Sequence, residues 1–406
     1  MSAGSEPRRS ERDLRLDFFR GIGMFIILIA HIPGNAWINW IPARFGFSDA
    51  TEIFVFCSGM ASAYAFARVF DRHGQAIGTA RIGLRVWQIW WAQIGVFVAV
   101  LAAMIVADRM FATDSYTRTL QFDRFFADPA SGILGLVTLT YVPNYFDILP
   151  MYLVILGMIP LVMAVERLAG GRVVLVLLGL LWLAAQARIT ALPADPWSER
   201  VWYFDPAGWQ LVFFTGFGFV RGWLPAPPRS KTLVVLALLL VLVSIPFTWL
   251  PMVRSLPFLQ ASHEELRPLF AKTPFGLLRH LHFLALAYLA WLAVGPAGQR
   301  LKGVLVEQVV AVGRQTLAVF LSGIVLARIL GVVLDQLGPG WLVTLLVNLA
   351  GMAALLAVAR VVQWYKDTPW TRRTPRPSPP AAMGAEGRPP DATVGKAAPR
   401  VSCAAS

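Results

Sequence analysis

The stretch LRLDFFRGIGMFIILIAHIPGNAW, residues 14–37, begins with charges, becomes apolar and then carries a single histidine, His31. Its apolar run has the length of a helix that enters the roughly 30 Å hydrocarbon core of a bilayer. An ionisable ring inside such a span is costly, so it marks a candidate functional site. The stretch therefore predicts a membrane helix that carries chemistry.

The composition of the whole chain agrees with this prediction. Hydrophobic residues make up 57% of the 406 residues and charged residues only 15%, whereas soluble domains are about one quarter charged. Lipid permits only helices and closed barrels to span it, and the apolar runs lack the alternation of barrel strands. We expect an all-α, polytopic integral membrane protein.

Ten apolar runs are candidate transmembrane spans. They cover residues 18–33, 52–70, 84–107, 147–165, 173–190, 208–224, 232–248, 280–297, 314–334 and 341–363. Segments rich in Lys and Arg alternate with the other loops, which is the positive-inside pattern and predicts that both termini are cytoplasmic. The net charge of +13 lies largely at these span ends, so we expect no nucleic-acid partner.

The chain divides into three parts on this basis. Residues 1–17 form a cytoplasmic segment, residues 18–365 a ten-span membrane domain, and residues 366–406 a cytoplasmic tail. The tail is rich in Pro, Ala and Arg, which predicts disorder. Residues 132–146 are interrupted at Pro143 and are expected to form a re-entrant or surface segment on the outer side.

The first span carries Arg20 and His31 on one helix face. They lie eleven positions apart, which is about three turns or roughly 16 Å of rise. Arg20 therefore lies at the inner edge and His31 in the outer half. Arg20 can be a positive-inside anchor and His31 a packing group bonded to a neighbouring helix. An imidazole can also act as a general base near neutral pH.

The second span opens with FSDATEIFVFCSGM, residues 47–60. Asp49 as N-cap with Glu52 three residues later predicts a capping box. Either carboxylate can also orient the His31 ring, because both are expected on the outer side. Ser58 and Gly59 favour a point of close helix packing over a nucleophile.

Further polar side chains are expected on the outer side. YVPNYFDILP, residues 141–150, places Asn144 and Asp147 between two prolines, where irregular backbone at membrane depth needs a cavity lined by protein or water. RHLHF, residues 279–283, opens the eighth span with Arg279 and His282.

Arginines on and near the inner side have two interpretations. Arg81 and Arg85 in RIGLR lie one helical turn apart, so they are either positive-inside anchors or an anion site for phosphates. Arg314 and Arg328 lie within or at the edge of the ninth span, and each needs a partner or an anionic substrate.

Several familiar catalytic motifs are absent from the sequence. It contains no P-loop, GxSxG, HExxH or paired CxxC motif, and its two cysteines support no metal site. We therefore expect neither a bound metal nor a permanent cofactor.

RLDFFRGIGMFIILIAH, residues 15–31, resembles the opening of the membrane acyltransferase-3 superfamily, whose members carry Arg, ten residues and then His in the first span. FVFCSGM is similar to that superfamily's FFxxSGF pattern in the second span, with Met60 in place of Phe. RIGLR is similar to its RxxR pair at the third span, with one more residue between the arginines.

A narrower resemblance is to the OpgC family. It rests on the ordered succession of FGFSDATEIFVFCSGM, YVPNYFDILPMY, FDPAGWQLVFFTG, HFLALAY and GRQTLAVF, and it covers residues 12–365. OpgC proteins are associated with succinyl substitution of osmoregulated periplasmic glucans in bacterial inner membranes. The ten-span architecture is also that of the superfamily.

The resemblance and the residues together predict a multi-pass O-acyltransferase of the bacterial inner membrane. Acyl-CoA, expected to be succinyl-CoA, is the donor substrate and a periplasmic glucan is the acceptor. His31 is the expected general base, with Asp49 or Glu52 holding its other ring nitrogen. The expected binding residues are Arg20, Arg81 and Arg85 for the donor phosphates, Asn144, Asp147 and His282 for the acceptor, and Arg279 or Arg314 for a succinyl carboxylate.

Two other functions remain open from the sequence. One is an O-acetyltransferase of the same superfamily that acts on another envelope polysaccharide. The other is a transporter or flippase, in which the buried charges serve a substrate or proton path.

Overall fold

The structure is a computed structural model that describes residues 13–368 and Trp370. Within these residues the chain is helical apart from its loops and one isolated β-bridge between Pro193 and Val201. The predicted all-α fold is therefore confirmed. The first twelve residues of the predicted N-terminal segment, and the predicted tail beyond Trp370, lie outside the described residues.

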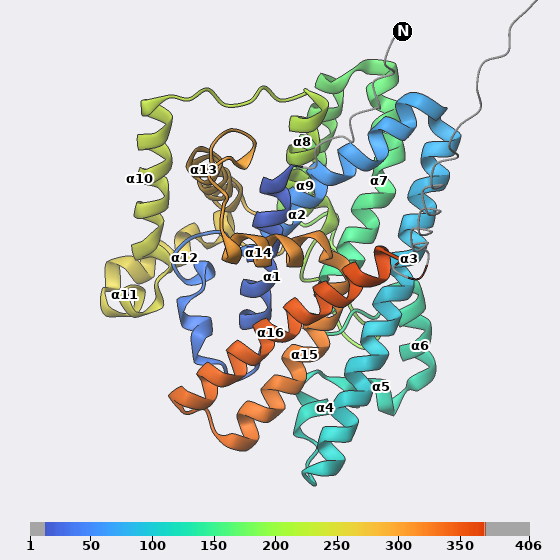
Figure 1. Cartoon of the computed structure of the whole chain (residues 1–406), viewed down its shortest axis with the longest axis vertical. Coiled ribbons are helices and arrows are strands. Elements are labelled where there is room, and N and C mark those ends of the chain that lie inside the picture. Colours follow the sequence, from blue (N-terminus) through green and yellow to red (C-terminus); the bar gives the residue numbers. More distant parts are fainter. Residues whose placement is uncertain (1–12, 369, 371–406) are drawn as a thin grey trace, which may run out of the picture.

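Ten helices correspond to the ten predicted spans. They are α1 (Leu14–His31), α2 (Ala50–Ser62), α3 (Arg68–Met110), α7 (Ile148–Ala169), α8 (Gly171–Gln186), α9 (Pro206–Arg221), α10 (Lys231–Thr248), α13 (Leu277–Val294), α15 (Thr316–Leu337) and α16 (Trp341–Lys366). Figure 1 shows most of them running roughly along the long axis of the molecule, with α1 near the centre.

Six stretches of the described chain are long and apolar enough to cross a membrane, so the chain is a multi-pass membrane protein. One of the six, Ala50–Met110, contains two of the predicted spans. Helices α8 and α9 have only 16 residues each, and α1 has charged residues at Arg15, Asp17 and Arg20 in its first two turns. The count of ten and the side on which each terminus lies therefore stay predictions.

A bend within α3 differs from the sequence prediction. Residues 71–83 lie between the predicted spans 52–70 and 84–107 and are rich in Arg, so a cytoplasmic loop is expected there. They are instead helical, and the chain turns at Gly74, where φ is +79°. Glycine adopts this left-handed backbone without a steric penalty from Cβ. Figure 1 shows the chain reversing there, so that the rest of α3 descends beside α7.

Helix α14 (Val304–Arg314) was not predicted, and it crosses α1 at very short range. A Cβ added to Gly21 would lie 2.0 Å from the carbonyl oxygen of Val309. A Cβ added to Gly313 would lie 1.7 Å from that of Asp17. Glycine at both positions therefore lets the two backbones touch, as small residues do in membrane helix packing. Figure 1 shows α14 lying across α1.

Short helices form much of the remaining chain. They are α4 (Ser115–Thr119), α5 (Phe122–Ala127), α6 (Pro129–Thr138), α11 (Leu250–Ser255) and α12 (Pro257–Phe270). The predicted segment 132–146 is thus the end of α6 followed by turns, and these turns lead into α7.

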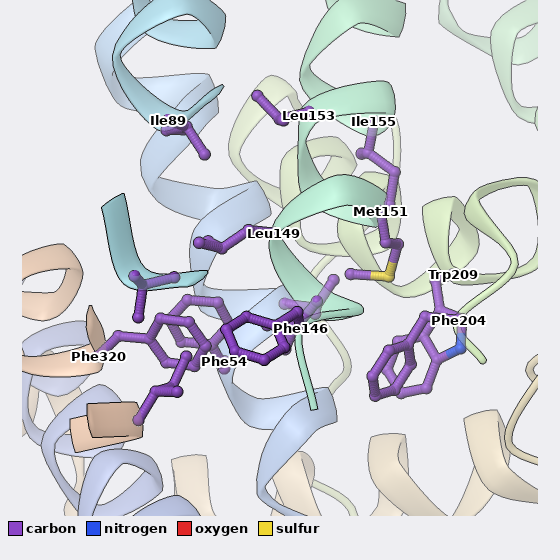
Figure 2. Close-up of a cluster of buried hydrophobic side chains, with 14 of the residues drawn as sticks. Phe54, Ile89, Phe146, Leu149, Met151, Leu153, Ile155, Phe204, Trp209 and Phe320 are labelled. Atoms are coloured by element: carbon purple, nitrogen blue, oxygen red, sulfur yellow. The ribbon is translucent and has the colours of Figure 1, made fainter. Parts of the chain in front are cut away.

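A core of apolar side chains joins the central helices (Figure 2). Phe54 of α2 stacks on Phe320 of α15 with ring centroids 5.7 Å apart. Both side chains are at least 94% buried. Gly59 of α2 confirms the predicted close packing, because a Cβ there would lie 1.9 Å from the carbonyl oxygen of Phe213 in α9. These contacts fix α15 and α9 against α2.

Candidate active site

His31 is the last residue of α1, and its ring is oriented by its own helix. The ring atom Nδ1 lies 2.7 Å from the carbonyl oxygen of Ile27, one turn earlier. A carbonyl oxygen only accepts hydrogen bonds, so Nδ1 carries the hydrogen. In the neutral ring Nε2 then keeps its lone pair. The helix therefore holds His31 in the tautomer that a general base at Nε2 requires.

Tyr145 and Arg328 lie beside this ring. The ring of Tyr145 contacts His31 edge-on, with centroids 5.8 Å apart. The guanidinium carbon of Arg328, in α15, lies 3.8 Å from the centroid of the Tyr145 ring. Tyr145 has a φ of +75°, a conformation that costs a non-glycine residue about 1–3 kcal/mol and persists only where the surroundings impose it.

Arg200 holds the turn in which Tyr145 lies, before the start of α7. It donates to the carbonyl oxygen of Val142 at 2.6 Å and to the side-chain oxygen of Asn144 at 3.1 Å. Its Nε donates to Asp195 at 3.0 Å. Burial alone would raise the pKa of Asp195, but the bond from Arg200 lowers it. Asn144 was predicted to bind the glucan. In the structure its side chain accepts a hydrogen bond from Arg200 and so helps to hold the turn that contains Tyr145.

Asp49 and Glu52 form the predicted capping box at the start of α2. Their other partners are cations of a loop and of α13. Lys272 lies 2.6 Å from Asp49, and Arg279 bonds to Glu52, whose side chain is fully buried. Burial alone would raise the pKa of Asp49, but the charges of Lys272 and Arg279 hold it well below its ordinary value.

Asp49 and Glu52 were predicted to orient the His31 ring through a hydrogen bond. The bond expected from Asp49 or Glu52 to His31 is instead made by the carbonyl of Ile27. The charges of Asp49 and Lys272 nevertheless act on the His31 ring, as does that of Arg328. The ion-pair cluster and the His31 ring thus belong to one region of the molecule.

His282 and Asp147 are the other predicted outer residues, and both are buried. His282 bonds through Nδ1 to the hydroxyl of Ser48 at 2.7 Å, and its ring packs edge-on against Phe47. Asp147 is 95% buried at the start of α7. Its Oδ1 has no hydrogen-bond partner among the described residues.

The three arginines that were predicted to bind the acyl-CoA phosphates lie on two helices, α1 and α3. Arg20 of α1 donates to the carbonyl oxygen of Cys57 in α2 at 2.9 Å, while its buried Nε has no partner within the described part of the chain. Arg81 is exposed on α3, and Arg85 of the same helix bonds to Gln88. Arg20 is thus set between helices, whereas Arg81 is exposed and Arg85 partly exposed on α3.

Arg314 ends α14 and pairs with α1. Its Nε lies 3.5 Å from a carboxylate oxygen of Asp17. The Asp17 side chain is 98% buried, whereas that of Arg314 is about half exposed. The expected substrate residue therefore takes part in the contact between α1 and α14.

A small cavity is lined in part by His31. Its other lining residues are Met24, Ile27, Leu28, Val319, Phe320, Gly323, Ile324 and Leu355. The space open to the centre of a water molecule is ≈ 10 Å³, which is room for about one water. The lining comes from α1, α15 and α16 and is apolar apart from the histidine.

A larger hollow of ≈ 310 Å³ lies between α3, α7 and α9. Arg221 lies in it and bonds to both Asp71 and Glu166 at 2.7–2.8 Å. None of the predicted donor residues lines this hollow. No group of three or more His, Cys, Asp or Glu side chains in residues 13–368 is arranged to hold a metal ion.

Sequence reasoning missed two members of the region around His31. Tyr145 was passed over as one of many aromatics, and Lys272 as one of several cations in an outer loop. The signal for Tyr145 was its place between Asn144 and Asp147, which were both singled out. Arg328 was expected to need a partner or an anionic substrate, but its contact with Tyr145 was not foreseen.

The chain matches the family described as OpgC protein over residues 12–367, which is most of its length. The chain belongs to the OpgC family. No curated protein and no solved structure is significantly similar to it. Membership of the OpgC family supports a transferase that modifies a glucan.

Proposed function

We propose that this OpgC-family chain is an O-acyltransferase of the bacterial inner membrane that moves a succinyl group from succinyl-CoA onto a hydroxyl of a periplasmic glucan. The observation that carries the proposal is the state of His31. The carbonyl of Ile27 fixes Nδ1 as a donor, so Nε2 is left as a base at the end of a membrane helix.

The reaction needs one proton acceptor and one acyl donor. As a glucan hydroxyl oxygen attacks the thioester carbonyl carbon, Nε2 of His31 takes its proton. A C–O bond forms and the C–S bond breaks, and the imidazolium then returns its proton to the departing CoA thiolate. General base catalysis of this kind contributes about 10²–10⁴-fold to a rate.

Asp49 and Glu52 support this chemistry indirectly. Their bonds to Lys272 and Arg279 tie the loop before α13 to the start of α2. The charges of Lys272 and Asp49 also act on the His31 ring, in opposite senses and less strongly than its burial and its bond to Ile27. The orientation of the ring itself comes from the backbone of α1.

The two substrates approach His31 from opposite sides in this proposal. On the donor side, the unsatisfied Nε of Arg20 and the cations Arg81 and Arg85 offer bonds to CoA phosphates. The acyl arm approaches His31 along the apolar cavity between α1 and α15, which has room for about one water and has to widen to admit the arm. On the acceptor side, the half-exposed ring of Tyr145 presents a face on which a sugar can stack, with Asp147 and His282 as further polar contacts.

The experiment is an acyl-transfer assay with purified protein, labelled succinyl-CoA and a glucan. The variant His31→Gln should lose at least about 10²-fold in rate. His263→Gln is a matched control, because His263 also bonds through Nδ1 to a backbone carbonyl, that of Phe247, at 2.6 Å. Equal activity of the two variants would remove the base from the proposal.

The same assay separates the proposal from its alternatives. Label transfer in detergent, without a transmembrane gradient, supports an enzyme over a transporter or flippase. Replacing succinyl-CoA with acetyl-CoA tests the O-acetyltransferase alternative. Faster transfer from acetyl-CoA would favour that activity.

A further inference from the structure

Arg328 is a buried cation whose partners differ from those of other arginines in the membrane domain. Its side chain is 96% buried in α15. Arg279 pairs with Glu52 and Arg314 with Asp17. For Arg328, no ion pair is found within the described part of the chain, and its Nη2 has no hydrogen-bond partner there. Its close polar contacts are with Tyr145, whose ring centroid lies 3.8 Å from the guanidinium carbon and whose side chain also hydrogen-bonds to it.

A guanidinium that is buried without an anionic partner costs free energy. Burying a charge costs several kcal/mol unless it is paired and hydrogen-bonded. Charged side chains inside membrane helices are for this reason expected at substrate pathways or beside partners. The contact with Tyr145 satisfies one face of the guanidinium by a cation–π interaction and leaves donor hydrogens in its plane. The side chain therefore fits an anion that is bound during function.

The packing of α15 against α1 places Arg328 at the level of His31. One turn before Arg328, Ile324 lines the same cavity as His31. Three residues after it, Gly331 lies against the ring of Pro33, where a Cβ would be 2.4 Å from the proline Cδ. Arg328 thus lies between two points of α15 that contact the end of α1. Tyr145 contacts both side chains.

We propose that Arg328 binds the free carboxylate of the transferred acyl group and so selects dicarboxylic acyl thioesters. The inference rests on the proposed function and assigns the substrate class at the same site. A guanidinium presents two parallel donors that match a carboxylate. Arg328 takes the role that the sequence analysis gave to Arg279 or Arg314, which is to bind the succinyl carboxylate. The guanidinium groups of Arg279 and Arg314 are already paired with carboxylates of the chain.

The test compares two donors of equal chain length. Succinyl-CoA and butyryl-CoA both carry a four-carbon acyl group, but only the first ends in a carboxylate. For the variant Arg328→Gln, kcat/KM with succinyl-CoA should fall by about 10- to 150-fold, the loss of one hydrogen-bonded charge pair. The value with butyryl-CoA should stay within about threefold of wild type. Arg328→Lys should retain part of the preference for succinyl-CoA.

The outcomes separate the two levels of the proposal. An equal fall with both donors in Arg328→Gln would overturn the selection role, because a structural or oxyanion-binding arginine serves both. Inactivity of the wild type with both donors would overturn the proposed function and this inference with it. Should Arg328→Gln fail to fold, Arg328→Lys decides: a smaller preference for succinyl-CoA over butyryl-CoA than in the wild type supports the role, and an unchanged preference overturns it.

Discussion

Replacing Arg279 with methionine should destabilise the protein by leaving a buried carboxylate without its cation. The Arg279 side chain is 11% exposed and that of Glu52 is 0% exposed. Removing one partner of a buried ion pair typically costs about 3–5 kcal/mol. Glu52 keeps its bond from the Asp49 backbone N–H, and Lys272 remains nearby, so we expect the lower end, about 3 kcal/mol.

The assay is equilibrium unfolding of the purified protein in mild detergent, followed by tryptophan fluorescence during titration with SDS. A loss of about 3 kcal/mol corresponds to roughly 150-fold in the unfolding equilibrium. The double variant Arg279→Met with Glu52→Gln removes the stranded charge, so it should recover most of that loss. Arg254→Met is the control, because Arg254 is exposed on α11.

Two results would refute this reasoning. Wild-type stability of Arg279→Met would show that the pair contributes nothing. A double variant that is no more stable than Arg279→Met would show that the cost does not come from the uncompensated Glu52.

Three further predictions concern the supports of the site. Gly313→Val should separate α14 from Asp17 in α1 and lower the free energy of unfolding by at least about 1–3 kcal/mol. The measurement is the thermal unfolding midpoint, which should fall. An unchanged midpoint would contradict the close approach of the two helices. Arg200→Ala should free the turn that carries Tyr145, which limited proteolysis would show as faster cleavage. The lowered pKa of Asp195 adds stability above about pH 4 that is lost as pH falls through the folded pKa, so Asp195→Asn should flatten the acid limb of a stability–pH curve.

The sequence predicted the helices well where hydropathy alone determines them. Each predicted span overlaps a helix, because a long apolar run has few alternatives in lipid. The capping box at Asp49 was equally readable, since it depends on two residues close in sequence. The loop predicted at 71–83 was wrong because charged residues mark a membrane surface without ending a helix. Helix α14 was missed because 11 residues are too few for a span.

Only part of the candidate site could be predicted from the sequence. His31 could be singled out because an imidazole in an apolar run is unusual. The neighbours of its ring could not, since Tyr145 and Arg328 reach it from a turn and a helix far away in the sequence. The partner of Nδ1 is the backbone carbonyl of Ile27. Every residue has such a carbonyl, so the residue types could not indicate that this one accepts the bond.

The most direct test of the central claim is transfer across a sealed membrane. The protein is reconstituted in liposomes that enclose labelled succinyl-CoA, and the glucan is supplied only outside. The account predicts that the wild type labels the external glucan and that His31→Gln does not, while His263→Gln still does. Labelled glucan from His31→Gln at the wild-type rate, or transfer only when both substrates share one side, would contradict it.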